Sequence, residues 1–178
     1  MVGNLTKSSK ETILRDEIKV MDALEQNSKE SVDQIAKRCG LSRQKVWRII
    51  KDLEKRKVIW GYTAETDEIA KHLKHFTLLV KRSTLPFNDD IRKEVMFDKL
   101  DNRLPGLVKI ENIYATHGMA DFIFTFYAPN IITAKKFVGL LFSKHTNYIQ
   151  DYFLLETLFP IRKNGIKNPQ MKNLSEYL

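Results

Sequence analysis

A run of helix caps between positions 31 and 42 constrains the first third of this chain. Ser31 and Gln34 have the spacing of a capping box, in which the Ser31 hydroxyl accepts from the Gln34 backbone amide and the Gln34 side chain reaches back. Gly40 is expected to end the helix that follows, because glycine adopts the positive φ found after a last helical turn. Ser42 then caps a new helix. Two helices must therefore meet at a tight turn.

Apolar residues at three- and four-residue steps predict helices around this turn. The first is expected over residues 13–26, a short one follows Ser31, and the third runs from about Arg43 to Lys57. The buried stripes are expected to be Leu14, Ile18, Met21 and Leu24, then Val32, Ile35 and Ala36, then Val46, Ile50 and Leu53. A helix, a capped short helix, a glycine turn and a third helix form a helix-turn-helix. Val58–Thr63 after it is predicted to be a short strand or wing.

Positive charge is concentrated on the third helix. The chain has a net charge of +8, and residues 37–57 hold nine basic side chains against Asp52 and Glu54. Such a patch attracts polyanions, and the hydrophilic face of the helix is about as wide as a DNA major groove. We therefore predict double-stranded DNA as a partner. The expected contacts are Ser42, Arg43, Gln44, Lys45, Trp47, Arg48 and Lys51.

Two alternatives stay open for this domain. A winged-helix domain can serve protein contacts alone, and Trp47 can either stack on a DNA sugar or pack on a neighbouring helix. Lys51 and the helix N-terminus are expected on phosphate, whereas Arg43, Gln44, Lys45 and Arg48 are expected in the major groove.

Composition excludes several other classes of protein. The longest stretch without a charge, Phe122–Ala134, has 13 residues, whereas a membrane-spanning helix needs about 20. Residues 1–10 lack the apolar core of a secretory signal. The single cysteine, Cys39, excludes a disulfide framework and a CxxC zinc site. We expect a cytoplasmic protein that contacts no membrane and has no metal site or cofactor.

Alternating apolar residues predict a different architecture in the rest of the chain. Strands are expected over 75–81, 108–116, 121–127 and 148–159, and helices over 89–103 and from Pro129–Asn130 onward. The order βαββαβ is the ferredoxin-like split unit, a four-stranded antiparallel sheet with both helices on one face. The fold class is therefore α+β, a winged helix-turn-helix followed by a ferredoxin-like domain.

The sheet is expected to have apolar side chains on both faces. Phe153 and Leu155 fall on one side of the last strand and Leu154 and Leu158 on the other. Helices cover only one face, so the other needs a partner, and a second copy is the simplest one. We predict a homodimer whose two basic helices contact half-sites about one helical turn apart.

These patterns predict five segments along the chain. They are a flexible N-terminus over 1–12, the DNA-binding domain over 13–63, a linker over 64–74, a ferredoxin-like ligand-binding and oligomerisation domain over 75–160, and a basic tail over 161–178. The tail is either a flexible arm on DNA or an extra oligomer contact.

Residues 14–159 resemble the Lrp/AsnC family of transcription regulators. The resemblance rests on Ile35–Ser42, on Leu53 followed by Val58–Thr63, and on Gly118–Asp121. It implies dimers that assemble into octamers through the C-terminal domain, and an amino acid or related small molecule bound near the Gly118 turn. The implied effector-binding residues are His117, Gly118, Met119, Ala120 and Asp121.

The turn also has a purely structural interpretation. Its backbone amides can hold a carboxylate and Asp121 an ammonium, but Gly118 can also simply permit the turn while Asp121 caps it. The chain departs from the family at Ala120, where an aromatic or acidic residue is common, and at His117, where a small residue is common. A different effector, or none, is compatible with these departures.

Two other functions fit the same architecture. Siroheme decarboxylases resemble it and use histidine and arginine near a porphyrin, and His117 lies in the corresponding turn. Those enzymes lack the Gly61–Tyr62–Thr63 closure and need no basic patch, so we expect a protein that is not an enzyme. The third possibility is an architectural protein that coats DNA without operator specificity.

Overall fold

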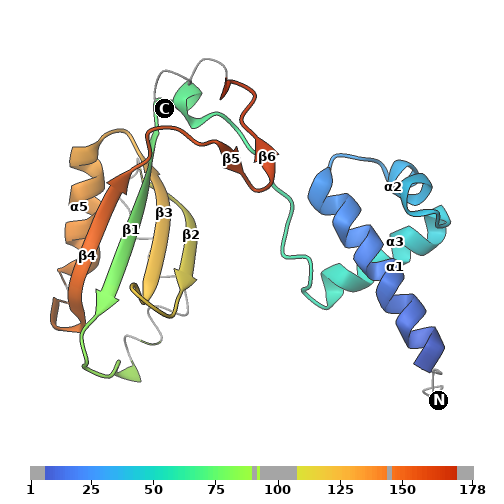
Figure 1. Ribbon diagram of the computed structural model, residues 1–178, viewed down its shortest axis with the longest axis horizontal. Helices are drawn as coiled ribbons and strands as arrows, with labels where there is room; N and C mark the ends of the chain where they lie inside the picture. Colours follow the sequence, from blue (N-terminus) through green and yellow to red (C-terminus); the bar gives the residue numbers. More distant parts are fainter. Residues whose placement is uncertain (1–6, 90–91, 93–107, 144–145, 172–178) are drawn as a thin grey trace. The chain divides into compact units, whose positions relative to one another are not determined.

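The computed structural model describes residues 7–89, 92, 108–143 and 146–171 (Figure 1). It divides into two units, Met1–Ala64 and Glu65–Leu178. Unit 1 contains α1 (Lys7–Gln26), α2 (Val32–Cys39) and α3 (Arg43–Lys55). Helix α1 begins at Lys7, so residues 7–12 of the N-terminal segment that the sequence predicts to be flexible are helical.

The predicted caps between the helices of unit 1 are confirmed. The Gln34 amide donates to Ser31 Oγ over 3.3 Å, and the Ser31 amide donates to Gln34 Oε1 over 2.8 Å. Gly40 ends α2 with φ of 66°, and Ser42 caps α3 by accepting from the Lys45 amide. These local interactions fix the turn between α2 and α3.

The core of unit 1 lies between α1 and the other two helices. It consists of Val20, Ala23, Ile35, Ala36, Cys39, Val46 and Ile50. The predicted stripe of α1 is wrong at Leu14 and Ile18, whose side chains are 56% and 44% exposed. The buried face instead passes through Asp16 and Val20, and the charge of Asp16 obscured it in the sequence.

The predicted strand or wing over Val58–Thr63 is not formed as a strand. The Val58 and Ile59 amides both donate to the Leu53 carbonyl at the end of α3. The Tyr62 hydroxyl donates to Glu54 over 3.1 Å. These hydrogen bonds attach the segment to the end of α3 and do not pair it with a strand.

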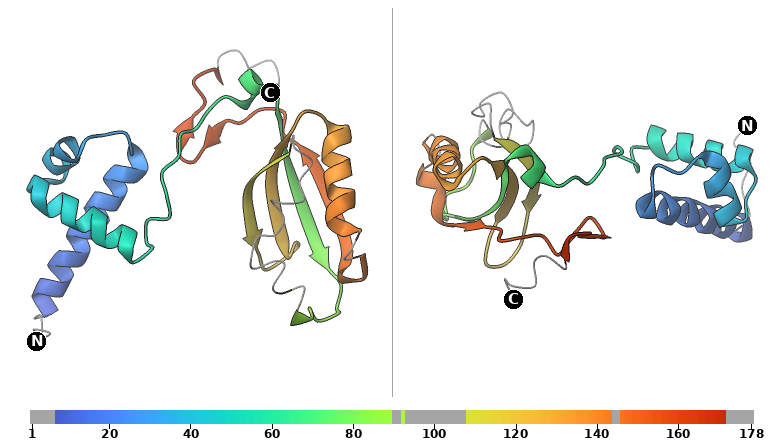
Figure 2. Two further views of the ribbon diagram at one scale, coloured as in Figure 1. Left: turned by 180° about the vertical axis from the view of Figure 1, so that it is seen from behind. Right: turned by 90° about the horizontal axis from the view of Figure 1, so that it is seen from above.

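Unit 2 contains a four-stranded antiparallel sheet. Its strands are β1 (Lys74–Arg82), β2 (Lys109–Ala115), β3 (Phe122–Ala128) and β4 (Ile149–Glu156), in the order β2-β3-β1-β4. Helix α5 (Ile131–Phe142) covers one face (Figure 2). This is the expected ferredoxin-like order. The helix predicted over 89–103 falls mostly outside the described residues.

Side chains from β1, β3 and α5 form the core of unit 2. It includes Phe76, Leu78 and Val80 of β1, Phe124 and Phe126 of β3, and Ala134, Phe137 and Val138 of α5. The alternate residues of the strands face away from α5, because successive side chains of a strand point to opposite faces.

A β-bulge interrupts the pairing of β2 with β3. Ile110 pairs with Phe126 and Asn112 with Thr125, so Glu111 is an extra residue. The bulge leaves Glu111 and Asn112 both on the face of the sheet that α5 does not cover, where Glu111 contacts Tyr127 and Asn112 contacts Thr125.

The described part of the C-terminal tail folds as a hairpin. Strands β5 (Arg162–Lys163) and β6 (Ile166–Lys167) pair antiparallel around Asn164 and Gly165. Both turn residues have positive φ, 43° and 81°. Short helices η1 (Glu68–Lys71) and η3 (Thr146–Tyr148) complete unit 2.

Candidate nucleic-acid interface and effector turn

One face of α3 presents polar and basic side chains to solvent. Residues 46, 50 and 53 of α3 are buried, so the opposite positions are free of the core. The exposed residues include Arg43, Gln44, Trp47, Arg48 and Lys51, and steps of three or four residues link positions 43, 47 and 51 and positions 44, 48 and 51. Trp47 is 53% exposed. Six of the seven predicted DNA-contacting residues, these five and the cap Ser42, are therefore exposed.

Acidic neighbours partly compensate the charge of this face. Arg43 Nε lies 3.4 Å from Asp33 Oδ1, and Lys51 Nζ lies 2.8 Å from Glu54 Oε2. The hydrogen bond from Lys51, followed by that from Tyr62, lowers the pKa of Glu54. These pairs are exposed, so a phosphate can replace the carboxylate at small expense.

Lys45 is placed differently from the other predicted DNA-contacting residues. Its Nζ lies 2.5 Å from Oδ2 of Asp16, whose side chain is 5% exposed. The hydrogen bond from Lys45 lowers the pKa of Asp16 against the effect of burial. Lys45 thus joins α3 to α1. The sequence reasoning missed Asp16, although it lies one helical turn before the core residue Val20.

The turn over His117–Ala120 joins β2 to β3. His117, Gly118 and Met119 are exposed, Met119 by 78%, and Ala120 is buried. Gly118 has φ of 131°, in the region that favours glycine. The Thr116 amide donates to the Asp121 carbonyl and the Thr116 hydroxyl to the Ala120 carbonyl, so the turn is closed by its own residues.

The Asp121 carboxylate is held against β1. Its Oδ2 accepts from the Arg82 amide over 2.9 Å and lies 3.2 Å from Lys81 Nζ. Lys81 also donates to the Gly118 carbonyl over 3.1 Å. The pKa of Asp121 is lowered, first by the Arg82 amide and then, against burial, by Lys81. Asp121 therefore anchors the turn, and Lys81 supplies an ammonium beside it.

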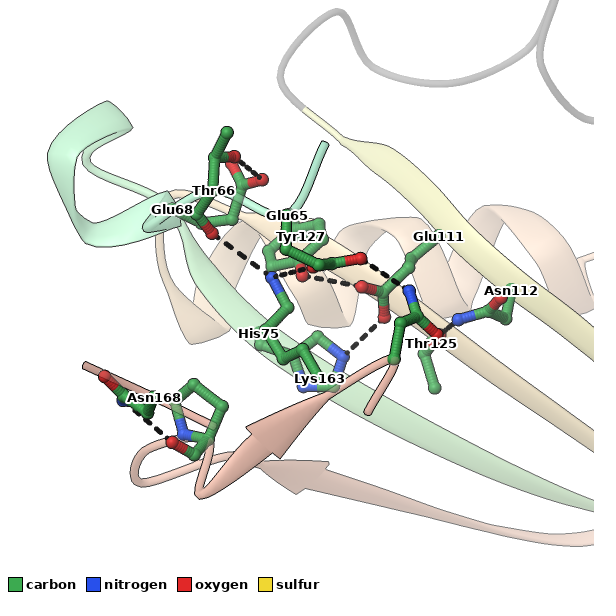
Figure 3. A network of polar contacts seen from close by, with 12 residues as sticks. Glu65, Thr66, Glu68, His75, Glu111, Asn112, Thr125, Tyr127, Lys163 and Asn168 are labelled. Carbon is green, nitrogen blue, oxygen red and sulfur yellow. Dashed lines mark hydrogen bonds and ion pairs between the residues drawn. The ribbon is translucent and has the colours of Figure 1, made fainter. Parts of the chain in front are cut away.

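A polar network on the sheet face opposite α5 was missed by the sequence reasoning (Figure 3). His75 Nε2 lies 3.1 Å from Glu111 Oε2, and the Tyr127 hydroxyl donates to Glu111 Oε1 over 2.7 Å. Burial raises the pKa of Tyr127 to about 12, with a further contribution from Glu111. The bulge that brings Glu111 to this face leaves no clear pattern in the sequence.

Apolar side chains lie farther along the strands on the same sheet face. Phe153 and Leu155 of β4 are 54% and 53% exposed, and they alternate with the more buried Leu154. Tyr114 of β2, opposite Ile123, is 50% exposed. The described part of unit 2 therefore has a sheet face with large apolar groups in water.

Two further searches of the described residues bear on function. Across residues 7–89, 92, 108–143 and 146–171, there is no cluster of three or more histidine, cysteine, aspartate or glutamate side chains suited to a metal ion. Within the same part of the chain, each helix is too short or too polar to cross a membrane.

Comparison with known proteins defines the class of the first unit. Residues 17–59 match the family of winged helix-turn-helix DNA-binding domains. An uncharacterised HTH-type transcriptional regulator, YugG of Bacillus subtilis (strain 168), is 27% identical over 125 residues, which are 69% of this chain and 72% of YugG. The three helices of unit 1 therefore resemble those of winged helix-turn-helix DNA-binding domains over residues 17–59.

Solved structures share the fold of the whole chain. An AsnC family transcriptional regulator from Agrobacterium tumefaciens has a TM-score of 0.64 at 22% identity, covering 89% of this chain and 97% of its own. A transcriptional regulator from Neisseria meningitidis, in complex with L-Met, has a TM-score of 0.63 at 19% identity, covering 98% and 100%. The predicted fold and the resemblance to Lrp/AsnC regulators are confirmed: the chain has their two-domain fold. A DNA-binding transcription regulator is the function that these comparisons support.

Proposed function

We propose that the protein is a dimeric transcription regulator that binds DNA through α3 and responds to an amino acid. The observation that carries this proposal is the exposed basic face of α3 in a domain that matches winged helix-turn-helix DNA-binding domains. A regulator of this kind works in the cytoplasm, without a cofactor and without catalysis.

The exposed side chains divide into two kinds of DNA contact. Arg43, Gln44 and Arg48 are on the N-terminal half of α3, the part of a recognition helix that contacts base edges. Lys51 lies a turn later and suits phosphate, as do the free amides of the α3 N-terminus. Trp47 stands between Arg43 and Lys51 on the same face and can stack on a sugar. Lys45 contributes through its bond to Asp16, by fixing α3.

Footprinting on the DNA upstream of the protein's own gene tests this proposal. Two protected half-sites about one helical turn apart are expected. With roughly 6–10 phosphate contacts, affinity should fall by about 10³- to 10⁵-fold between 50 and 200 mM salt. Continuous protection along the fragment would instead indicate an architectural DNA-coating protein. The absence of protection at low salt would reject DNA binding, and porphyrin binding would then be the function to assay.

Two substitutions separate base contacts from phosphate contacts. Arg43→Ala should relax the preference for one base pair, by about 1–3 kcal/mol. Lys51→Ala should weaken all sequences alike and reduce the salt slope by about one. Equal effects of both on sequence preference would contradict this assignment.

The sheet face opposite α5 is the proposed dimer interface. Phe153, Leu155 and Tyr114 expose large apolar surface there, and a second copy of the same face would bury it. Leu155→Asp should shift the protein toward monomer in analytical ultracentrifugation. Ile132→Asp on α5, at a residue that is 64% exposed on another surface, is the matched control and should leave the dimer intact. Assembly to octamers would appear in the same measurement.

The turn at Gly118 is the proposed effector site. The Neisseria meningitidis relative of this fold is in complex with L-Met, so L-methionine is the first ligand to test. His117 and Met119 are exposed and leave the anchoring bonds of Asp121 untouched. Met119→Ala and His117→Ala should weaken methionine binding in calorimetry without changing stability. Binding that is unchanged in both variants would place the effector elsewhere.

A further inference from the structure

We infer that the C-terminal hairpin is a clamp that fixes the start of the interdomain linker on unit 2 and thereby sets which half-site spacings the protein accepts. The hairpin is defined as residues 162–170, and the clamped segment as residues 65–67. The spacing consequence rests on the proposed function, whereas the clamp itself is testable without DNA.

Each of three consecutive linker residues is contacted by the hairpin. Figure 3 shows two of them, Glu65 and Thr66, with Lys163. Lys163 Nζ lies 3.2 Å from Glu65 Oε2 and donates to the Thr66 carbonyl over 3.3 Å. The Asn164 side-chain amide donates to Glu65 Oε1. The Gln170 side-chain amide donates to Asp67 Oδ2 over 3.3 Å. A segment of linker is therefore held by residues 97 to 103 positions later in the sequence.

The ion pair at the centre of the clamp is shielded from water. The side chains of Lys163 and Glu65 are 22% and 16% exposed, and the Lys163 ammonium lies 5.2 Å from the centre of the Tyr127 ring. Burial alone would lower the pKa of Lys163, but bonds to Tyr127 and Glu65 outweigh it and raise that pKa. A shielded pair is screened by salt much less than an exposed one.

The hairpin presents Lys163 in a fixed conformation. Asn164 and Gly165 both have positive φ, as in the tight two-residue turns that suit β-hairpins. The Arg162 guanidinium donates to the Gly165 carbonyl over 2.6 Å, and the Asn168 side-chain amide donates to the Pro160 carbonyl over 2.8 Å. These bonds close the turn and the base of the hairpin, so little freedom is lost when the clamp forms.

The clamp shortens the free tether between the two units. The last backbone bond of the linker to α3 is from Ile59, and the clamp begins at Glu65. Residues 60–64 span at most about 18 Å. Without the clamp the next element of unit 2 is η1, which begins at Glu68 and contacts β1, so residues 60–67 span up to about 29 Å. Because the tether limits the reach of each DNA-binding domain, the clamp restricts the separation of the half-sites.

The test compares the full-length protein with two clamp variants and one control. Lys163→Met keeps the aliphatic stem and removes the ammonium, and Glu65→Gln removes the opposite charge. Lys167→Met changes an exposed lysine of the same hairpin and is the matched control. Hydrogen exchange is measured at the amides of residues 65–73. In parallel, DNA is selected from a random 40-base-pair library, and the distance between selected half-sites is read by sequencing.

The clamp predicts faster exchange over residues 65–73, by at least about tenfold, in Lys163→Met and Glu65→Gln but not in Lys167→Met. It also predicts a broader distribution of half-site spacings in both clamp variants, with the half-site sequence unchanged. Unchanged exchange would overturn the clamp whatever the DNA result. Faster exchange with unchanged spacing would overturn its role in spacing. If the wild-type protein selects no DNA, the proposed function fails and the spacing role with it, while the exchange result still decides the clamp.

Discussion

Lys45 Nζ lies 2.5 Å from Oδ2 of Asp16, and so connects α3, the proposed recognition helix, to the only charged residue among the buried side chains of the described chain. The bond joins residues 29 positions apart. It gives Lys45 a structural role in a helix whose other basic side chains face solvent. A lysine in a basic helix is thus not automatically a DNA contact.

Replacing Lys45 by methionine should destabilise unit 1 and change its response to acid. The pKa of Asp16 is lowered in the folded protein, so its stabilising effect is present above the unfolded value of 3.8 and is lost as pH falls through the folded value. Lys45→Met leaves the carboxylate without its partner and should lower the helical melting temperature at pH 7. It should also flatten the acid dependence, measured by circular dichroism. Lys51→Met, on the exposed face, is the control, and an equal loss in both would contradict this role.

Replacing Gly40 by alanine should destabilise the turn between α2 and α3 by about 1 kcal/mol. Gly40 has φ of 66°, and an added Cβ would meet nothing within 4 Å, so the penalty is one of backbone conformation alone. Gly139→Ala provides the contrast, because Gly139 lies within α5 with similar open space and no positive φ. That change should stabilise by roughly 0.5–1 kcal/mol. Denaturant unfolding of both variants measures the change in the free energy of unfolding, which should be negative for Gly40→Ala and positive for Gly139→Ala.

Replacing Phe126 by alanine should reduce the free energy of unfolding of unit 2 by about 3–5 kcal/mol. Its ring is fully buried and lies 4.8 Å from that of Phe137 on α5. Ile132→Ala on the outer surface of α5 should change stability by less than about 0.5 kcal/mol. Chemical denaturation followed by far-UV circular dichroism gives both free energies of unfolding. A similar loss of stability in the two variants would show that the core is elsewhere.

Alkaline pH should weaken unit 2 through Tyr127. The folded pKa of Tyr127 is about 12, against 10.0 for an ordinary tyrosine, so its stabilising effect is complete below pH 10 and is lost as pH rises toward 12. Tyr127→Phe should remove this part of the pH dependence of unfolding. Tyr114→Phe alters a half-exposed ring on the same sheet face and should leave the dependence unchanged.

Local signals made most of the fold predictable. The capping box at Ser31 and the positive φ at Gly40 depend on neighbours within four residues, and alternating phenylalanines mark β3. Long-range features left no comparable signal. The sequence does not predict that Asp16 lies on the buried face of α1, because its partner Lys45 is on another helix. It does not predict the contact of Lys163 either, because Glu65 is far away in sequence.

The bulge in β2 has a consequence for how relatives of this sequence should align. Deleting Glu111 would bring Asn112 directly after Ile110 and restore a regular ladder opposite Thr125 and Phe126. Every other side chain of the strand would keep its face, so the chain would lose one carboxylate and no register. In an alignment, relatives that lack the bulge should show a one-residue gap at position 111. The same relatives should carry other residues at the positions of His75 or Tyr127, because the carboxylate that these two side chains contact would be absent.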